Sequence, residues 1–197
     1  NSYLIIVDRY SRYTWVFLTK GKRPPTDILK LFFMQHKQDN IPNKVIKTDK
    51  GGELWASADF RQICADNGYI PLPTAPDAPF QNGMAERPNQ TLANITRCLL
   101  HTAGLSSKYW SFALIHAVYL KNRLPHNTTL QTPIFMYTGK RPSAKRLRIF
   151  GCRVMARLPG KRAAKLDSHT AVGIFLGYTA TEKNIYYQDV NTLRIKT

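Results

Sequence analysis

The sequence predicts a mixed α/β fold followed by a small β module. Strand-like apolar runs alternate with amphipathic helical stretches as far as Val118. From Ile149 onward the pattern changes to short β-type runs separated by Gly and Asn turns. A hydrophobic content of 43% over 197 residues is enough for a buried core. We therefore predict two domains, residues 1–140 and residues 141–197.

The first two elements are predicted to be paired strands. Residues 3–7 form a short, β-branched apolar run, and residues 13–19 alternate aromatic and aliphatic side chains. The polar segment 8–12 between them is typical of a turn, so we expect a hairpin. After a break at residues 21–25, Thr26 can cap a helix that continues to about residue 39.

The next stretch predicts two strands, a helix and a loop. Residues 44–48 form a short strand that delivers Asp49 at its end, and two glycines then turn the chain. Residues 58–67 have apolar side chains at helical spacing, and Gly68 suits the position after a helix end. Residues 69–72 are a further strand. Residues 71–83 are rich in Pro, Ala, Asn and Gly, which predicts a mobile loop.

Two helices and a β module complete the prediction. A helix begins near Glu86 to Pro88, because proline is tolerated in a first helical turn. The second helix has apolar residues at i, i+3, i+4, i+7 and i+8, which predicts a core face rather than a cofactor site. Residues 122–148 are a polar connector. The β-type runs at residues 149–158, 171–178, 185–189 and 192–195 indicate a small barrel. The stripe of the second helix consists of Trp110, Ala113, Leu114, Ala117 and Val118.

The charge balance favours a polyanionic partner. There are 29 Lys and Arg residues against 12 Asp and Glu, which gives +17. Nucleic acid is the commonest partner of so basic a protein, although anionic membrane surfaces attract the same charge. Residues 141–197 contain 12 of the basic residues and only 3 acids. The run at residues 140–148 is either a solvated linker or a phosphate-binding strip formed by Lys140, Arg141, Lys145 and Arg146.

Cysteine and histidine usage argues against two classes of structural site. The three cysteines are scattered and odd in number, which argues against a disulfide framework and fits a reducing compartment. The five histidines are not paired with cysteines at zinc-finger spacing. His126 and His169 are expected at the surface. No apolar run approaches the roughly 18 residues of a membrane helix, so no membrane partner is expected.

Two acidic segments carry the candidate chemistry. Asp49 ends a strand before two glycines, and Glu86 begins a helix after the predicted loop. The 36 residues between them (86 − 49 − 1) leave room to bring both side chains over one sheet edge. Carboxylate oxygens are the ligands that Mg²⁺ and Mn²⁺ prefer, and such metals catalyse phosphoryl displacement. Taken singly, Asp49 is compatible with a turn acid and Glu86 with a first-turn acid at the helix dipole.

Several segments together resemble a known family. Residues 47–53 and 81–91 are similar to the second and third acidic motifs of the Asp-Asp-Glu integrases of retroviruses and long-terminal-repeat retrotransposons. Residues 7–15 resemble the copia-type branch in particular. Residues 147–152 and 174–178 resemble the SH3-like barrel that follows the catalytic core in that branch. The resemblance covers nearly the whole chain, with the motifs in the family's order.

The resemblance implies a ribonuclease H-like mixed sheet flanked by helices, then an SH3-like barrel. It implies that Asp49 and Glu86 are catalytic and bind Mg²⁺ or Mn²⁺. It places Gln81, Asn82 and Gly83 in the active-site loop and Asn89 on the following helix, as DNA contacts at best. The family's first acid is expected upstream of Asn1, and Asp8 is interpreted as a turn residue.

The implied activity is processing of the 3′ ends of element DNA and strand transfer into target DNA. The implied partners are DNA, RNA through the parent polyprotein, and further copies of the chain. The implied location is the nucleus or a cytoplasmic particle. Two alternatives stay open, because a fold does not fix a function. One is a catalytically inactive nucleic-acid-binding remnant that lacks the first acid, and the other is a ribonuclease H-type nuclease.

Overall fold

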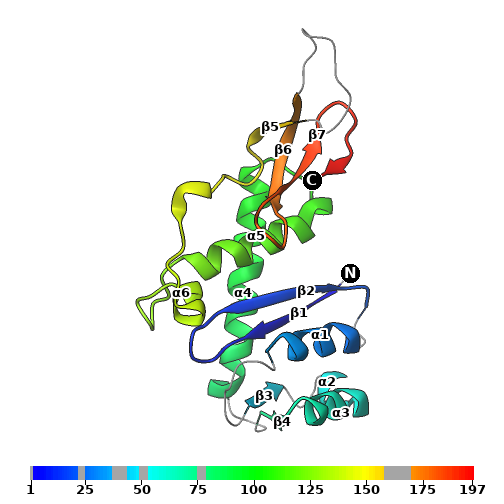
Figure 1. The fold of residues 1–197 in the computed structure, drawn as a ribbon, viewed down its shortest axis with the longest axis vertical. Helices are drawn as coiled ribbons and strands as arrows, with labels where there is room; N and C mark the ends of the chain where they lie inside the picture. Colours follow the sequence, from blue (N-terminus) through cyan, green and yellow to red (C-terminus); the bar gives the residue numbers. More distant parts are fainter. Residues whose placement is uncertain (1, 22–24, 37–43, 49–52, 75–78, 158–169) are drawn as a thin grey trace. The chain divides into compact units, whose positions relative to one another are not determined.

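The structure is a computed structural model that describes residues 2–21, 25–36, 44–48, 53–74, 79–157 and 170–197 (Figure 1). The chain forms two compact units. Unit 1 contains Asn1–Ile6 and Trp15–Asn89, and unit 2 contains Val7–Thr14 and Gln90–Thr197. The elements are β1 (Ser2–Val7), β2 (Thr14–Thr19), α1 (Thr26–His36), β3 (Lys44–Thr48), α2 (Glu53–Ala56), α3 (Ala58–Asp66), β4 (Tyr69–Pro73), α4 (Pro79–Thr102), η1 (Ser107–Tyr109), α5 (Trp110–Arg123), α6 (Pro133–Thr138), η2 (Ala144–Arg146), β5 (Arg153–Arg157), β6 (Thr170–Tyr178), β7 (Ile185–Asp189) and β8 (Ile195–Lys196).

The predicted mixed α/β class is confirmed. Within the described residues the strands form three sheets: the pair β1–β2, the pair β3–β4 and the four-stranded sheet β5-β6-β7-β8. The β3–β4 pair is parallel, whereas the four-stranded sheet is antiparallel. The finer expectations, a ribonuclease H-like sheet, an SH3-like barrel and a division near residue 140, stay predictions.

The long helix α4 begins earlier than the sequence predicted. The prediction placed a loop at residues 71–83 and the helix start near Glu86, but β4 includes residues 71–73 and α4 starts at Pro79. Pro79 suits the first turn of α4, because the N–H that proline lacks would have no partner within the helix there. Pro88 lies inside the helix instead. Residues 75–78 of the predicted loop lie outside the described residues.

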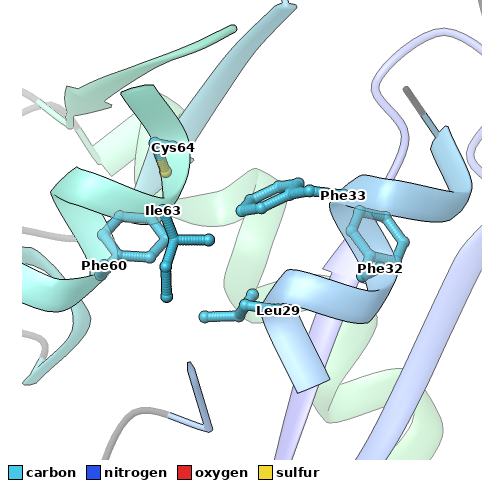
Figure 2. Packing of buried hydrophobic residues seen from close by; sticks show 6 residues of the cluster. All are labelled: Leu29, Phe32, Phe33, Phe60, Ile63 and Cys64. Atoms are coloured by element: carbon cyan, nitrogen blue, oxygen red, sulfur yellow. The ribbon is translucent and has the colours of Figure 1, made fainter. Parts of the chain in front are cut away.

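The core of unit 1 lies between α1 and α3. Figure 2 shows Leu29 and Phe33 of α1 directed toward Phe60 and Ile63 of α3. The helix α3 is fixed at both ends. Ser57 accepts a hydrogen bond from the Phe60 N–H, and Asn67 and Gly68 close the last turn as predicted, with Gly68 at φ +73°. Partly buried side chains of β1, β2, β3 and β4 pack against this cluster: Leu4, Ile6, Trp15, Phe17, Ile46 and Tyr69.

The core of unit 2 joins α5 to the four-stranded sheet. Phe175 and Leu176 of β6 are fully buried, and Leu176 clusters with Ala113 of α5. The predicted apolar stripe of α5 is largely confirmed, since Ala113, Leu114, Ala117 and Val118 are buried while Trp110 is half-buried. The sequence pattern did not predict that His116 and Asn122 on the same helix are buried too.

A glycine marks the closest approach of two segments of unit 2. Gly151 has φ +81°, and a Cβ built there would lie 2.3 Å from the Cβ of Ala103 at the end of α4. Only glycine fits both the backbone conformation and the space. This requirement gives a structural reason for a glycine in the motif at residues 147–152.

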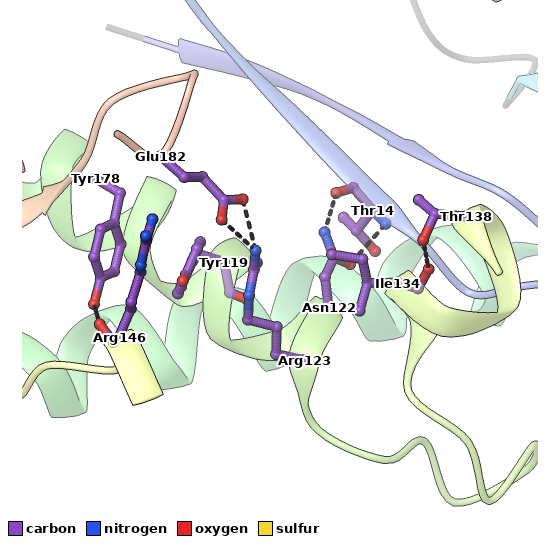
Figure 3. A network of polar contacts seen from close by, with 9 residues as sticks. All are labelled: Thr14, Tyr119, Asn122, Arg123, Ile134, Thr138, Arg146, Tyr178 and Glu182. Atoms are coloured by element: carbon purple, nitrogen blue, oxygen red, sulfur yellow. Dashed lines mark hydrogen bonds and ion pairs between the residues drawn. The ribbon is translucent and has the colours of Figure 1, made fainter. Parts of the chain in front are cut away.

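A buried asparagine ties the turn after β1 to α5. Asn122 donates to the carbonyl oxygen of Thr14 at 2.8 Å and accepts from the Thr14 N–H at 2.9 Å (Figure 3). Both side chains are almost fully buried. One residue further along α5, Arg123 makes two hydrogen bonds to the carboxylate of Glu182, at 2.6 and 2.7 Å. The two hydrogen bonds between Asn122 and Thr14 fix the β1–β2 turn within unit 2.

Replacing Asn122 tests this attachment. Asn122→Ala leaves both backbone groups of Thr14 buried without partners, so we expect the free energy of unfolding to fall by about 2 kcal/mol. The exposed Asn127 is the matched control, and Asn127→Ala is expected to change stability by less than about 0.5 kcal/mol. Urea unfolding of both variants measures the difference. Equal stability of the two variants would contradict the attachment.

Candidate functional site

The candidate site begins at the carboxyl ends of the parallel strands β3 and β4. Lys44 pairs with Tyr69 and Thr48 with Pro73, so both strands end at the same edge of the pair. The Thr74 N–H donates to the Thr48 carbonyl oxygen at 2.8 Å, which extends the contact one residue further. Asp49 follows Thr48 directly, although its own placement lies outside the described residues. The chain that leads to α4 leaves from the same edge.

Glu86 lies on the first part of α4, in unit 1. It is seven residues after Pro79, about two turns into the helix, and its side chain is exposed. The alternative in which Glu86 is only a first-turn acid at the helix dipole is therefore wrong, because the first turn of α4 contains no acid. Its carboxylate forms no hydrogen bond or ion pair with the residues that the structure describes. The oxygens are available to an external ligand.

Asn89 shares a helix face with Glu86, because the two residues are three apart. The Tyr3 hydroxyl of β1 donates to Asn89 Oδ1 at 2.6 Å. This contact connects the first strand to the acidic face of α4 within unit 1, and no pattern in the sequence signals it. Gln81, Asn82 and Gly83 belong to α4 rather than to a loop, and their side chains lie outside the described residues.

Asp8 has the structural role that the sequence predicted. Its Oδ2 accepts hydrogen bonds from the Ser11 N–H at 2.7 Å and from the Ser11 hydroxyl at 2.6 Å. Its backbone N–H donates to the Tyr13 carbonyl oxygen, and its carbonyl oxygen accepts from Arg12. A carboxylate that accepts from groups three residues further along stabilises the turn between them. Asp8 therefore organises the β1–β2 connection.

The predicted basic strip lies at the surface of unit 2. Lys140, Arg141, Lys145 and Arg146 are all exposed. None forms an ion pair with a described acid, whereas Arg123 and Lys196 elsewhere in the unit are paired with Glu182 and Asp189. The Tyr178 hydroxyl donates to the backbone oxygen of Arg146 and so fixes the strip at η2 (Figure 3). The strip therefore presents exposed cations without an ion-pair partner among the described residues, and the Arg141 guanidinium lies 5.6 Å from the centre of the Phe135 ring.

Mg²⁺ would fit the chemistry of the donor set, since both candidate acids provide oxygen ligands. Within the described part of the chain, no three His, Cys, Asp or Glu side chains lie together as a metal site. Asp49 is not among those residues. The observation that supports the fit is the exposed carboxylate of Glu86, which has no ion-pair partner among the described residues.

Comparison with known proteins finds similar sequences among retrovirus-related Pol polyproteins. The chain is 33% identical over 181 residues, 90% of its length, to the retrovirus-related Pol polyprotein from transposon TNT 1-94 of Nicotiana tabacum. The chain is homologous to copia-type Pol polyproteins. Two Pol polyproteins of Arabidopsis thaliana agree: transposon RE2 is 29% identical over 99% of the chain, and transposon RE1 is 30% identical over 98%. The chain spans only 13 or 14% of the length of these relatives.

The fold of the chain is similar to that of a chain in a solved structure. A chain of the simian T-cell lymphotropic virus intasome in complex with PP2A regulatory subunit B56 gamma matches with a TM-score of 0.56. The match covers 94% of this segment and 68% of that chain, at 16% sequence identity. At this identity the likeness concerns the fold alone. A scan against protein-family models found no match. Among the described residues of the segment, no helix has the length and apolarity needed to cross a membrane.

Proposed function

We propose that this chain is the catalytic segment of a retrotransposon integrase, which processes the 3′ ends of element DNA and transfers them into target DNA. The homology to copia-type Pol polyproteins and the fold shared with a chain of a retroviral intasome support the proposal. The observation that supports the site is the parallel β3–β4 pair, because β3 ends one residue before Asp49 and β4 ends at the same edge.

In this proposal Asp49 and Glu86 hold Mg²⁺ or Mn²⁺. When bound, such a metal lowers the pKa of a water or hydroxyl and stabilises the leaving oxygen of a phosphodiester. Glu86 supplies its carboxylate from α4, so the position of its Cα is set by the helix. Asn89, one turn along, keeps its amide N–H groups available for a DNA phosphate while its oxygen accepts from Tyr3.

DNA is the proposed substrate, and the basic strip is proposed to contact its phosphates. Lys140, Arg141, Lys145 and Arg146 are exposed and unpaired among the described residues. Phosphate contacts of this kind position DNA without reading its sequence. Assembly of several copies on DNA, and a nuclear or cytoplasmic-particle location, belong to the same proposal.

Metal binding tests the site directly. Mn²⁺ is titrated into the protein and followed by electron paramagnetic resonance. Asp49→Asn and Glu86→Gln are each expected to weaken Mn²⁺ binding by about 10-fold or more, because each removes a charged oxygen ligand. Asp59→Asn is the matched control, since Asp59 is an exposed acid of unit 1 on α3. Equal Mn²⁺ affinity of all four proteins would exclude the proposed metal site.

A further inference from the structure

Three basic side chains gather in unit 2, away from both candidate acids in the sequence. Arg12 lies in the turn between β1 and β2, Lys121 in the last turn of α5, and His126 in the segment after α5. The Lys121 ammonium donates to the Thr14 hydroxyl at 2.8 Å and to the Arg12 carbonyl oxygen at 3.3 Å. Arg12, Lys121 and His126 are called the basic cluster below.

The backbone that carries Arg12 is fixed. Arg12 has φ +62°, a conformation that residues other than glycine rarely adopt. Its N–H donates to the Asp8 carbonyl oxygen at 2.9 Å, and its own carbonyl oxygen accepts from Lys121. Two residues later, Thr14 is bound through its backbone to Asn122. The Arg12 side chain therefore leaves from a backbone position that is set by contacts with α5.

The positive charges of Arg12 and Lys121 have no ion-pair partner among the described residues. The Nε atom of Arg12 is buried and has no hydrogen-bond partner among the described residues. Neither Arg12 nor Lys121 forms an ion pair there, unlike Arg123 with Glu182. A buried, unpaired charged donor is costly, and each such group requires an explanation. The C-terminal end of α5 favours a cation at Lys121, but it does not account for Arg12 in the turn.

His126 lies within range of the charges of Lys121 and Arg12 and has a ring N–H donor. The Thr128 N–H donates to His126 Nδ1 at 3.2 Å, so in the neutral ring the proton resides on Nε2. Burial lowers the pKa of His126, and the charges of Lys121 and Arg12 lower it further. Burial and the charge of Arg12 likewise lower the pKa of Lys121. The sequence placed His126 at the surface, whereas the structure half-buries it beside two cations.

We infer that Arg12, Lys121 and His126 form a phosphate-binding site. A phosphate oxyanion accepts hydrogen bonds from a guanidinium, an ammonium and an imidazole N–H, and it supplies the negative charge that the cluster lacks. The backbone phosphate of a nucleic acid and free inorganic phosphate share this chemistry. The site does not depend on the proposed metal site, so it stands even if Asp49 and Glu86 bind no metal.

Inorganic phosphate tests the site by itself. Phosphate is titrated into the protein at constant pH while the ring resonances of His126 are followed by NMR, with chloride at equal ionic strength as the comparison. We expect a saturable shift with phosphate alone, its loss in Arg12→Gln and its partial return in Arg12→Lys. Arg9→Gln is the matched control, because Arg9 lies in the same turn and is exposed. An equal response to phosphate and chloride in the wild-type protein would overturn the site, whatever the stability of the variants.

Duplex DNA then distinguishes the two sources of phosphate. The dependence of DNA affinity on salt concentration is measured for the same variants. Arg12→Gln is expected to reduce the slope of log affinity against log salt by about 1, whereas Arg9→Gln leaves it unchanged. An unchanged slope in Arg12→Gln, with phosphate binding still present in the wild type, would overturn nucleic acid as the ligand. Neither experiment includes a divalent metal, so both results are independent of the proposed metal site. Failure of the catalytic proposal would appear instead as unchanged Mn²⁺ binding in Asp49→Asn and Glu86→Gln.

Discussion

Glu86→Gln is expected to reduce Mg²⁺-dependent strand transfer about 1000-fold. Glutamine keeps the shape of the side chain but removes the negative charge of a metal ligand, and metal stabilisation of the transition state is worth several kcal/mol. Glu86 lies exposed within α4 and has no described partner, so the substitution is expected to leave the fold intact. The assay uses a longer protein that contains this chain.

The control for this prediction is DNA affinity. Glu86→Gln is expected to keep the DNA affinity of the wild-type protein within about twofold, since Glu86 adds no favourable phosphate contact. Glu182→Gln is the matched glutamate substitution, and it is expected to retain strand transfer because Glu182 pairs with Arg123 in unit 2. Strand transfer by Glu86→Gln at the wild-type rate would remove Glu86 from the metal site.

Acidification is expected to destabilise unit 2 through His116. The His116 side chain is almost fully buried among Tyr119, Phe150, Phe175 and Tyr178, and neither ring nitrogen has a partner among the described residues. Burial lowers the pKa of His116 from 6.5 to about 4. The unfolded chain therefore takes up a proton at a higher pH than the folded chain. The stability that depends on neutral His116 is complete above pH 6.5 and is lost as the pH falls toward 4.

The expected loss is about 3 kcal/mol over this pH range, since a shift of one pKa unit corresponds to about 1.4 kcal/mol. His116→Phe is expected to abolish this part of the pH dependence, because phenylalanine suits the aromatic surroundings and has no titratable group. His101→Phe is the matched control, since His101 is exposed on α4. Urea unfolding of both variants between pH 7 and pH 4, followed by NMR resonances of unit 2, measures the effect. The same pH dependence in His116→Phe and in the wild type would refute this account.

Local periodicity predicted much of the fold, and it failed where distant residues decide. The apolar spacing of α5 correctly predicted Ala113, Leu114, Ala117 and Val118 as core residues. It could not predict that Asn122 on the same helix is buried, because its partner Thr14 is 108 residues away in the sequence. The start of α4 was placed too late because Pro79 and Pro88 satisfy the same local rule.

The candidate site was predicted only in part, because local patterns indicate its residues but not how separate elements pack. The acidic motifs around Asp49 and Glu86, and the basic strip, are local patterns that the sequence displays directly. The parallel pairing of β3 with β4 and the hydrogen bond from Tyr3 to Asn89 depend on how separate elements pack. The basic cluster was missed because Arg12, Lys121 and His126 come from three segments, none of which is notable alone.

The most direct test of the account is Mg²⁺-dependent joining of an element DNA end to a target duplex by a longer protein that contains this chain. The account predicts joined products with Mg²⁺ or Mn²⁺ and none after chelation of the metal, while DNA binding persists. A protein that is folded, binds the same DNA and forms no joined product with either metal would contradict it.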